Sequence, residues 1–323
     1  MTFIEEMKQK VLSGGMITKD EAIRLSGEEL TPLANAADDV RKKMCGDDFD
    51  ICTIINGKCG RCSEDCKYCA QSAYNPTKLI DTYPLVDTYK MVAEAKKNKE
   101  QGVLRFSIVT SGRRLSDEEV DKVCESIKEI REKVGIEVCV SFGLLEEKHF
   151  VKLKEAGATR VHCNLESSEK YFSSICTTHT YEEKIETIKA AKRAGMSVCS
   201  GGILGLGESG EDRIDMVMTA RELGVKSIPV NLLNPIPGTI YENNSHISIE
   251  EARRWIAVFR FIIPDASIRL AGGRGLLDDK GESCFASGAN ATISGDMLTT
   301  SGINVETDMK LLKQLGYTPR LCN

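Results

Sequence analysis

Four cysteines lie close together in the segment "NGKCGRCSEDCKYCAQS" (56–72), and three of them, Cys62, Cys66 and Cys69, form the pattern C-x3-C-x2-C. Thiolates are the ligands that iron–sulfur clusters and zinc prefer. Three cysteines on one loop can hold three irons of a [4Fe–4S] cluster and leave the fourth iron open to a reacting molecule. A structural zinc site needs four ligands, and the sequence has no second pair with zinc-finger spacing. The pattern therefore predicts an iron–sulfur reaction site, with a zinc knuckle or chance clustering as the alternative.

The bulk composition limits the class of protein. The chain has 323 residues, of which 41 % are hydrophobic, a net charge of −5 and 13 cysteines. Its dispersed basic residues argue against a nucleic-acid partner, and it has neither an apolar signal core nor a membrane-length apolar run. We therefore expect a soluble cytoplasmic protein that binds no nucleic acid and no membrane. In that reducing compartment an odd number of cysteines favours metal-binding and buried thiols over disulfides.

Helical and β-rich stretches follow a regular order along the chain. Residues 1–45 have helical patterns, with a threonine cap and acidic first turn in "ITKDEAIRLS". Thereafter amphipathic helical stretches separate eight predicted strands, at 51–56, 104–110, 136–142, 159–165, 196–204, 227–233, 267–273 and 289–295. This alternation predicts a (β/α)8 TIM-type barrel, with a doubly wound sheet as the alternative.

One domain is expected, since no linker or low-complexity tract divides the chain. It would comprise an N-terminal helical extension (1–45), a barrel (46–295) and a short C-terminal cap (296–323). Active sites of such barrels lie at the C-terminal ends of the strands. The cysteine segment directly follows the first predicted strand and is therefore expected at that face.

The cysteine pattern, with an aromatic residue at position 68, resembles the signature of radical S-adenosylmethionine enzymes, and the surrounding "CSEDCKYCAQS" is similar to the biotin synthase family. The similarity extends over about residues 45–320. It includes "HCNLESS" (162–168), "TTHTYEEKIETI" (177–188), "VCSGGILGLGE" (198–208), "IPVNLLNPIPGT" (228–239), "IRLAGGR" (268–274) and "CFASGANATISGDMLTT" (284–300), in the family's order.

The resemblance implies a reaction as well as a fold. S-adenosylmethionine would bind the open iron of the [4Fe–4S] cluster, and one electron would cleave it to a 5′-deoxyadenosyl radical. That radical would remove hydrogen from two saturated carbons of dethiobiotin, where one sulfur is inserted to form biotin. The resemblance also implies an electron-donor protein such as flavodoxin or ferredoxin, and a homodimer.

The family match assigns a set of groups to S-adenosylmethionine. Asn164 and Glu166 match a polar pair near the ribose, and Lys184 would face the carboxylate, where the family often has arginine. The backbone of Tyr68 would contact the adenine, and "VTSG" (109–112) the methionine moiety. The cofactor-binding set is thus Tyr68, Thr110, Ser111, Asn164, Glu166 and Lys184. Turn, cap or solvated-charge roles are the structural alternative for these residues.

Two further positions are assigned to the reaction. Asn231, at the end of "SIPVN", matches a family position that binds dethiobiotin. Arg269, in "SIRLAGG", would lie inside the barrel, where a buried guanidinium needs an anion or a metal-bound sulfide as partner. A structural salt bridge is the alternative for Arg269.

Biotin synthases also carry an auxiliary [2Fe–2S] cluster inside the barrel, held by three cysteines and one arginine, and this sequence departs from that pattern. Ser107 replaces the second-strand cysteine, whereas Cys139 and Cys199 match and Cys163 is new. Because neighbouring strands lie about 4.8 Å apart, thiolates on the third, fourth and fifth strands could reach one cluster.

We therefore expect a four-iron auxiliary cluster held by Cys139, Cys163 and Cys199, with an extra sulfide at the fourth iron. This resembles a variant of the family that is associated with anaerobes. A [2Fe–2S] cluster is the alternative cluster type, Cys59 is the rival third ligand, and buried apolar thiols are the structural alternative for all three cysteines. The other cysteines have no partner pattern and are expected to be incidental, namely Cys45, Cys52, Cys124, Cys176, Cys284 and Cys322.

Other functions stay open on the sequence alone. Hydrogenase maturases and methylornithine synthases share the barrel and the cysteine triad, but they would need other residues at the strand ends. An iron–sulfur electron carrier would not need so long a barrel, and a zinc-stabilised binding module would contain zinc without sulfide.

Overall fold

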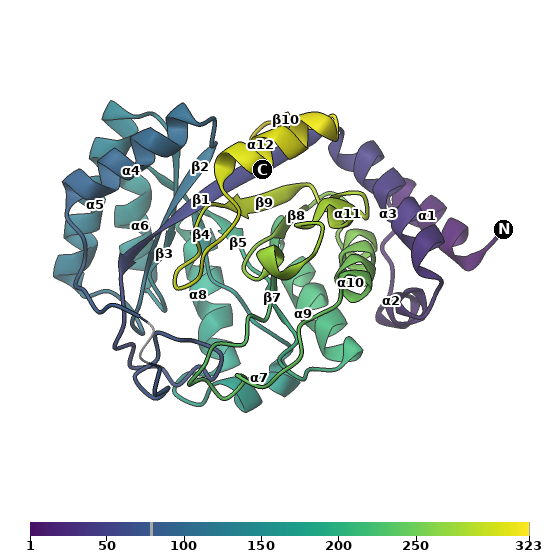
Figure 1. The fold of residues 1–323 in the computed structure, drawn as a ribbon, viewed down its shortest axis with the longest axis horizontal. Coiled ribbons are helices and arrows are strands. Elements are labelled where there is room, and N and C mark those ends of the chain that lie inside the picture. Colours follow the sequence, from purple (N-terminus) through teal and green to yellow (C-terminus); the bar gives the residue numbers. More distant parts are fainter. Residues whose placement is uncertain (78–79, 323) are drawn as a thin grey trace.

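A closed parallel barrel forms the centre of the computed structural model, which describes residues 1–77 and 80–322 (Figure 1). The hydrogen-bonded order β1-β2-β3-β4-β5-β7-β8-β9 returns to β1, and β6 continues the fifth barrel position beside β7. The strands are β1 (Asp48–Lys58), β2 (Arg105–Thr110), β3 (Glu137–Ser141), β4 (Ala158–His162), β5 (Ser197–Cys199), β6 (Gly202–Leu204), β7 (Ser227–Leu232), β8 (Ser267–Leu270), β9 (Ala291–Ser294) and β10 (Thr318–Pro319). The predicted TIM-type barrel is confirmed, and the doubly wound alternative is wrong because β9 pairs with β1.

Helices cover the outside of this barrel and extend it at the N-terminus. They are α1 (Phe3–Leu12), α2 (Lys19–Ser26), α3 (Leu30–Cys45), α4 (Thr88–Glu100), α5 (Asp117–Lys133), α6 (Glu147–Glu155), α7 (Glu169–Ile175), α8 (Tyr181–Arg193), α9 (Gly210–Glu222), α10 (Ile249–Ile262), α11 (Glu282–Phe285) and α12 (Val305–Gln314), with a 3-10 turn at Arg274–Leu276. Several begin at a serine or threonine whose side chain accepts from the third helical residue, as at Ser116 and Thr180. Figure 1 shows α1, α2 and α3 beside α10, on the outside of the barrel.

Alternation along the strands separates two environments. On β2, Phe106 and Ile108 are fully buried in the hydrophobic core, whereas Arg105 and Ser107 bond to groups from other barrel strands. The period of two thus directs apolar side chains to the helix layer and polar ones into the barrel.

Among the described helices, none is both long and apolar enough to cross a membrane.

Two details differ from the sequence-based expectation. The predicted strand 196–204 is interrupted at Ser200 and Gly201, so that β5 pairs with β4 while β6 pairs with β7. A Cβ on Gly201 would lie 2.1 Å from the Pro229 carbonyl oxygen, so the backbones approach more closely there than any other residue would allow. In addition, Asp48 of β1 pairs with Thr318 of β10, which brings the end of the chain back to the barrel.

Candidate active site

The loop after β1 is fixed by hydrogen bonds to its own backbone. The N–H and C=O of Cys62 pair with segment 71–73, both at 2.9 Å. The side-chain amide of Asn75 donates to the carbonyls of Cys66 (3.2 Å) and Cys69 (2.8 Å). These bonds fix the backbone positions from which the three cysteine side chains project.

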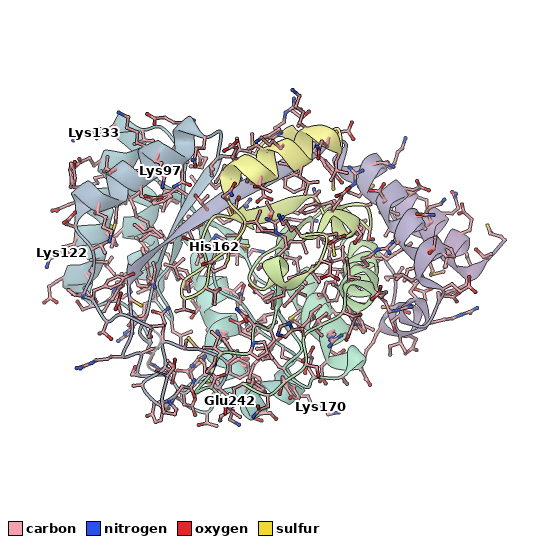
Figure 2. The ribbon with its side chains drawn as sticks, viewed as in Figure 1. Lys97, Lys122, Lys133, His162, Lys170 and Glu242 are labelled. Carbon is pink, nitrogen blue, oxygen red and sulfur yellow. The ribbon has the colours of Figure 1, made fainter. Side chains whose placement is uncertain are left out.

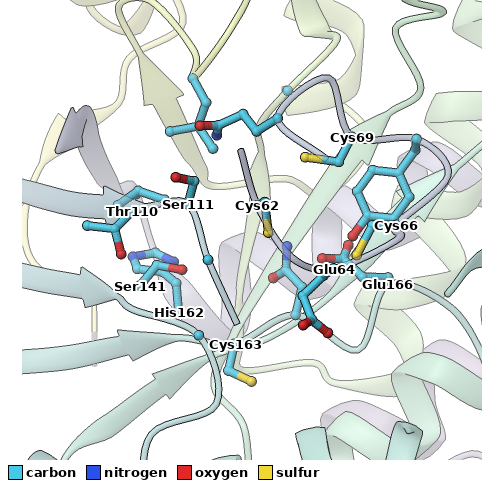
Figure 3. Close-up of a pocket in the computed structure, with 18 of the residues that line it drawn as sticks. Cys62, Glu64, Cys66, Cys69, Thr110, Ser111, Ser141, His162, Cys163 and Glu166 are labelled. Atoms are coloured by element: carbon cyan, nitrogen blue, oxygen red, sulfur yellow. The ribbon is translucent and has the colours of Figure 1, made fainter. Parts of the chain in front are cut away.

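The three cysteines line a cavity of about 410 Å³ at the C-terminal ends of the strands. Figure 3 shows the thiols of Cys62, Cys66 and Cys69 around a common space, and each residue is partly exposed. Burial raises the pKa of the Cys69 thiol to about 11, so a bound metal must displace its proton. Three separate thiols from one rigid loop, with space in front of them, fit a cluster that has one open iron.

The same cavity brings together the residues that the sequence assigned to S-adenosylmethionine and dethiobiotin. It is lined, among others, by Tyr68, Thr110, Ser111, Asn164, Glu166, Lys184 and Asn231. These side chains come from the cysteine loop, the ends of β2, β4 and β7, and helix α8. The structure thus places the predicted set in one space, while the role of each member stays a prediction.

Glu166 has the most unusual environment of this set. Its φ of +70° lies in the left-handed region, which non-glycine residues adopt mainly where surrounding structure enforces it. Its Oε2 is buried without a hydrogen-bond partner in the described part of the chain. Burial raises the pKa of Glu166, although the Lys184 ammonium and a hydrogen bond with Tyr68 oppose that rise. A buried acceptor without a partner fits a ligand that donates a hydrogen bond.

Other members of the set bond to neighbouring backbone. The Ser111 hydroxyl donates to the Gly60 carbonyl at 3.0 Å, and Oδ1 of Asn164 accepts from the Gly201 N–H at 3.4 Å. These bonds connect the ends of β2 and β4 to adjacent segments and fix both residues at the cavity wall.

Asn231 connects two strand ends through its side-chain amide. Its Nδ2 donates to the Gly202 carbonyl at 3.1 Å, and its Oδ1 accepts from the Gly272 N–H at 3.0 Å. Each polar atom therefore has a backbone partner, although the oxygen has a second lone pair and the nitrogen a second hydrogen.

A dense charge cluster lies deeper in the barrel. Asp50 pairs with Arg105 at 2.9 Å and with Arg160 and Arg269 at 3.3 Å each, and all four residues are buried. Burial alone would raise the pKa of Asp50, but the three guanidinium groups lower it to about 2. Three buried cations against one carboxylate leave an excess of two positive charges among the described residues. Nε of Arg269 is buried and has no hydrogen-bond partner among them.

Three cysteines lie close to this positive charge. Nη1 of Arg269 donates to the Cys52 sulfur at 3.3 Å, and the charges of Cys139 and Cys199 both act on the Arg269 guanidinium. Burial would raise the pKa of Cys139, but a hydrogen bond with His162 lowers it below the ordinary value. Burial raises the pKa of Cys52 to about 12, against the opposing effect of Arg269. Cys52, expected to be incidental, therefore joins the two predicted interior cysteines.

His162 connects the interior to the cavity. It lines the cavity, hydrogen-bonds with Cys139, and its Nε2 lies 3.2 Å from the Ser107 hydroxyl. Figure 2 shows His162 in the middle of the barrel, whereas the labelled lysines lie on the periphery. Ser107 therefore occupies the interior position where the family pattern has a cysteine.

The backbone of Cys163 adjoins Cys199, whose carbonyl accepts from the Cys163 N–H at 3.1 Å, but the Cys163 side chain lies at the cavity wall beside α8. Cys163 follows the last residue of β4, and its sulfur lies 4.0 Å from the Lys184 carbonyl on α8, in the hydrophobic core. Figure 3 shows its thiol pointing away from His162, as alternation along a strand requires of consecutive residues. The rival Cys59 is also elsewhere, since its backbone pairs with Tyr83 and its thiol hydrogen-bonds to Asn56 and Tyr83.

Sequence reasoning missed two residues beside the cysteine loop. Cys176 accepts a hydrogen bond from the Cys66 thiol at 3.8 Å, and Nδ1 of His179 lies 3.3 Å from the Cys176 sulfur. The bond from Cys66 and that with His179 lower the pKa of Cys176 to about 4, against its burial. The two segments are 110 residues apart, so no local spacing could have indicated the contact.

Comparisons with known proteins agree with this geometry. Residues 58–220 match the Radical SAM superfamily, and residues 229–318 match the Biotin and Thiamin Synthesis associated domain. The chain is 55 % identical over 318 residues to Biotin synthase 2 of Corynebacterium diphtheriae, covering 98 % of this chain and 96 % of that protein. It is also 55 % identical over 317 residues to a biotin synthase of Clostridium botulinum, covering 98 % and 99 % of the two chains.

Solved structures with low sequence identity share the architecture. A methylornithine synthase superimposes with a TM-score of 0.84 at 20 % identity, covering 98 % of this chain and 97 % of that one. An [FeFe]-hydrogenase maturase from Carboxydothermus hydrogenoformans gives 0.83 at 18 % identity, covering 99 % and 80 %. At such identities the likeness shows the fold alone.

Proposed function

Because this chain belongs to the biotin synthase family of radical S-adenosylmethionine enzymes, and is a sulfurtransferase that converts dethiobiotin to biotin, we propose that its reaction takes place in the cavity below the cysteine loop. The observation that carries this proposal is the convergence of Cys62, Cys66 and Cys69 on a cavity that strand-end polar groups also line. The position agrees with the general location of active sites in such barrels.

The three loop cysteines hold the [4Fe–4S] cluster, which supplies an electron to S-adenosylmethionine when it is bound. The protein contributes a preformed loop, since Asn75 already fixes the backbone of Cys66 and Cys69. The cavity walls keep water away from a reactive radical.

S-adenosylmethionine would lie between the cysteine loop and Glu166. The unpartnered Oε2 of Glu166 suits a hydroxyl donor such as a ribose group. The Lys184 ammonium, whose pKa the charges of Cys163 and Glu166 raise against its burial, would neutralise a carboxylate of the ligand. This arrangement supports the division of roles that the sequence predicted for Glu166 and Lys184.

Dethiobiotin would lie deeper, against Asn231. The bonds of Asn231 to Gly202 and Gly272 hold the amide rigid at the cavity wall. Its remaining hydrogen and lone pair would bind a ligand that offers both an acceptor and a donor, such as a cyclic urea group. Asn231 would thus position the substrate, while Arg269 belongs to the interior site.

For that interior site we propose an auxiliary iron–sulfur cluster, which supplies the sulfur atom when it is bound. The excess of two positive charges around Asp50 supports it, since thiolates and sulfides are anionic and buried cations need anionic partners. Cys139 and Cys199 would be two of its ligands, as the sequence predicts. His162 and Arg269 would contact it from β4 and β8.

The third ligand would be Cys52 in place of Cys163. The Cys52 sulfur lies 3.3 Å from Arg269, and its charge couples to those of Cys139 and Cys199. The Cys163 sulfur instead contacts α8. With three thiolates a four-iron cluster with an extra sulfide stays our proposal, and a [2Fe–2S] cluster is the alternative.

The remaining proposals concern the surroundings of the enzyme. Family resemblance supports a protein electron donor such as flavodoxin or ferredoxin, a homodimer and a cytoplasmic location. The partly exposed cysteine loop is compatible with electron entry from outside.

The test is anaerobic turnover of the iron-loaded protein with dethiobiotin, S-adenosylmethionine and a reductant, followed by mass spectrometry of biotin and 5′-deoxyadenosine. The wild type should form both products, and Cys66→Ala neither. Cys124→Ala is the matched control, because Cys124 is a buried cysteine on α5 outside the cavity. If Cys66→Ala still forms 5′-deoxyadenosine, the loop does not hold the reactive cluster.

A further inference from the structure

A second group of possible metal ligands adjoins the cysteine loop beside the cavity. The segment 174–179, which comprises the end of α7 and most of its connection to α8, bonds to the loop at several points. The Lys67 N–H donates to the Ile175 carbonyl at 3.0 Å, and the Asp65 N–H donates to the Thr178 hydroxyl at 3.1 Å. These bonds keep Cys176 and His179 beside Cys66.

The ligand atoms of Cys66, Cys176 and His179 all lie within 4.8 Å of one another. The two sulfurs are 3.8 Å apart, and Nδ1 and Nε2 of His179 lie 3.3 and 3.8 Å from the Cys176 sulfur. With Zn–S bonds near 2.3 Å and Zn–N bonds near 2.0 Å, a tetrahedral site has S···S and S···N edges of about 3.8 and 3.6 Å. The separations between Cys66 and Cys176 and between Cys176 and His179 are therefore close to two edges of a zinc site.

Two carboxylates complete the surroundings. Oε2 of Glu64 lies 2.6 Å from Nδ1 of His179, the ring nitrogen that is also nearer the Cys176 sulfur, so Nε2 binds the metal only after the imidazole ring turns about its bond to Glu64. Carboxylates commonly orient zinc-bound histidines in this way. Oδ1 of Asp65 lies 3.2 Å from the Cys176 sulfur and already accepts from the Thr177 and Thr178 N–H groups, so it fixes this segment and is not counted as a ligand.

We propose that Cys66, Cys176 and His179 form a binding site for a soft divalent cation such as Zn²⁺ in protein that lacks the iron–sulfur cluster of the loop. Cys66 belongs to both sites, so occupation of one excludes the other. Binding holds both sulfurs as thiolates with no change of oxidation state: the Cys66 thiol releases its proton to solvent, and Cys176, whose pKa is about 4, is already ionised at neutral pH. Zinc then withdraws one of the three cluster ligands, and iron–sulfur assembly must first displace it.

Zinc binding to iron-free, fully reduced protein under anaerobic conditions tests this proposal. A chromophoric chelator measures zinc affinity, and Co²⁺ replaces zinc as a spectroscopic probe. We expect one equivalent of zinc, and thiolate charge-transfer bands with tetrahedral ligand-field bands for Co²⁺. Cys176→Ala should weaken zinc binding at least about 100-fold, since loss of even an outer-shell partner costs 10–100-fold.

Cys69→Ala is the matched control, because Cys69 belongs to the loop but not to this group, and it should bind zinc as the wild type does. Zinc should also protect Cys66 and Cys176, but not Cys62, from alkylation. If zinc binding survives Cys176→Ala and is lost in Cys69→Ala, the loop cysteines alone hold the metal and the proposal is wrong. Octahedral Co²⁺ spectra would equally overturn it.

His179→Gln provides a second variant should Cys176→Ala fail to fold. Circular dichroism checks that each variant is folded. Assembly kinetics give an independent measurement. One equivalent of zinc should slow iron–sulfur reconstitution of the wild type and have no effect on His179→Gln. Equal slowing in both proteins would overturn the proposal. None of these measurements depends on biotin formation, so they stand or fall separately from the proposed function.

Discussion

Replacing Asp50 by Asn should destabilise the cluster-free protein strongly. Asp50 is fully buried, and its carboxylate is the shared partner of Arg105, Arg160 and Arg269. An amide of the same shape keeps the packing but removes the charge. Among the described residues the three buried guanidinium groups then lack a carboxylate partner, and Arg105 and Arg160 keep neutral acceptors such as the Cys322 carbonyl.

The magnitude follows from two estimates. The pKa of Asp50 falls from an ordinary 3.8 to about 2, and a tenfold change in an equilibrium corresponds to about 1.4 kcal/mol. The ionised carboxylate therefore stabilises the folded state by about 2–3 kcal/mol. Removing one partner of a buried ionic group costs about 3–5 kcal/mol, because the other charges are left uncompensated. We expect a loss of about 3–5 kcal/mol, or about 4–7 °C in Tm for a chain of this length.

The dependence on pH has a definite sign. Because the pKa of Asp50 is lower in the folded state, its stabilising effect is complete above pH 3.8 and is lost as the pH falls toward 2. The wild type should therefore lose this increment on acidification, whereas Asp50→Asn has none to lose.

Thermal unfolding of reduced, metal-free protein, followed by circular dichroism, measures the effect. Asp48→Asn is the control on the same strand, since Asp48 pairs with Arg320 at 3.2 Å in a largely exposed ion pair. Such pairs contribute about 0–1 kcal/mol. If the free energy of unfolding of Asp50→Asn lies within about 1 kcal/mol of that of the control, the buried charge cluster does not stabilise the barrel as argued.

Three further predictions concern the site. Cys52→Ala should lose the auxiliary cluster and form no biotin, while it still forms 5′-deoxyadenosine. Cys163→Ala should retain both clusters, as measured by iron and sulfide analysis. If instead Cys163→Ala loses the auxiliary cluster and Cys52→Ala keeps it, Cys163 is the ligand. Asn231→Ala should weaken dethiobiotin binding by about 1–3 kcal/mol in calorimetry and spare S-adenosylmethionine, so equal loss of both would indicate collapse of the cavity. Glu166→Gln should weaken S-adenosylmethionine binding with dethiobiotin affinity unchanged, and an unchanged affinity for both would remove Glu166 from the site.

Most of the fold could be predicted because local patterns and global architecture agree. Capping residues, acidic first turns and glycine stops mark the helices, and β-rich runs of similar length lie between them. The split between β5 and β6 could not be predicted, since it depends on how closely Gly201 approaches Pro229 on the neighbouring strand β7. Pairing of β10 with β1 also depends on tertiary contact between chain segments far apart.

The candidate site was predicted to different depths. The cysteine triad needs only local spacing, and the structure places all three on one cavity. The interior ligands depend on which face of a strand each residue occupies. Cys163 follows His162 directly, and consecutive strand residues point to opposite faces, so His162 meets Ser107 in the interior while Cys163 lies at the cavity wall beside α8. Strand adjacency alone favours Cys163, whereas alternation along the strands favours Cys52, and the choice between them stays a prediction.

The alternation of side chains between the two faces of a strand is a sequence signal that could have identified Cys52. Asp50 and Cys52 are two residues apart on β1, so they share a face, and a carboxylate in a barrel strand must face the interior charges. The same alternation in "SIRLAGG" places Arg269 inside. A cysteine on the interior face beside that arginine has better access to the site than one at a strand terminus.

Burial separates the two proposed clusters in a way that matches their chemistry. Cys62, Cys66 and Cys69 are partly exposed, so a cluster on the loop can meet both a ligand in the cavity and an electron donor from outside. Cys139 and Cys199 are fully buried among fixed positive charges, where anionic sulfur is stabilised and solvent is excluded. His162, which lines the cavity and bonds to Cys139, is the residue at the boundary of the two regions. Because this imidazole contacts both regions, the proposed transfer of sulfur from the interior to dethiobiotin would take place beside His162.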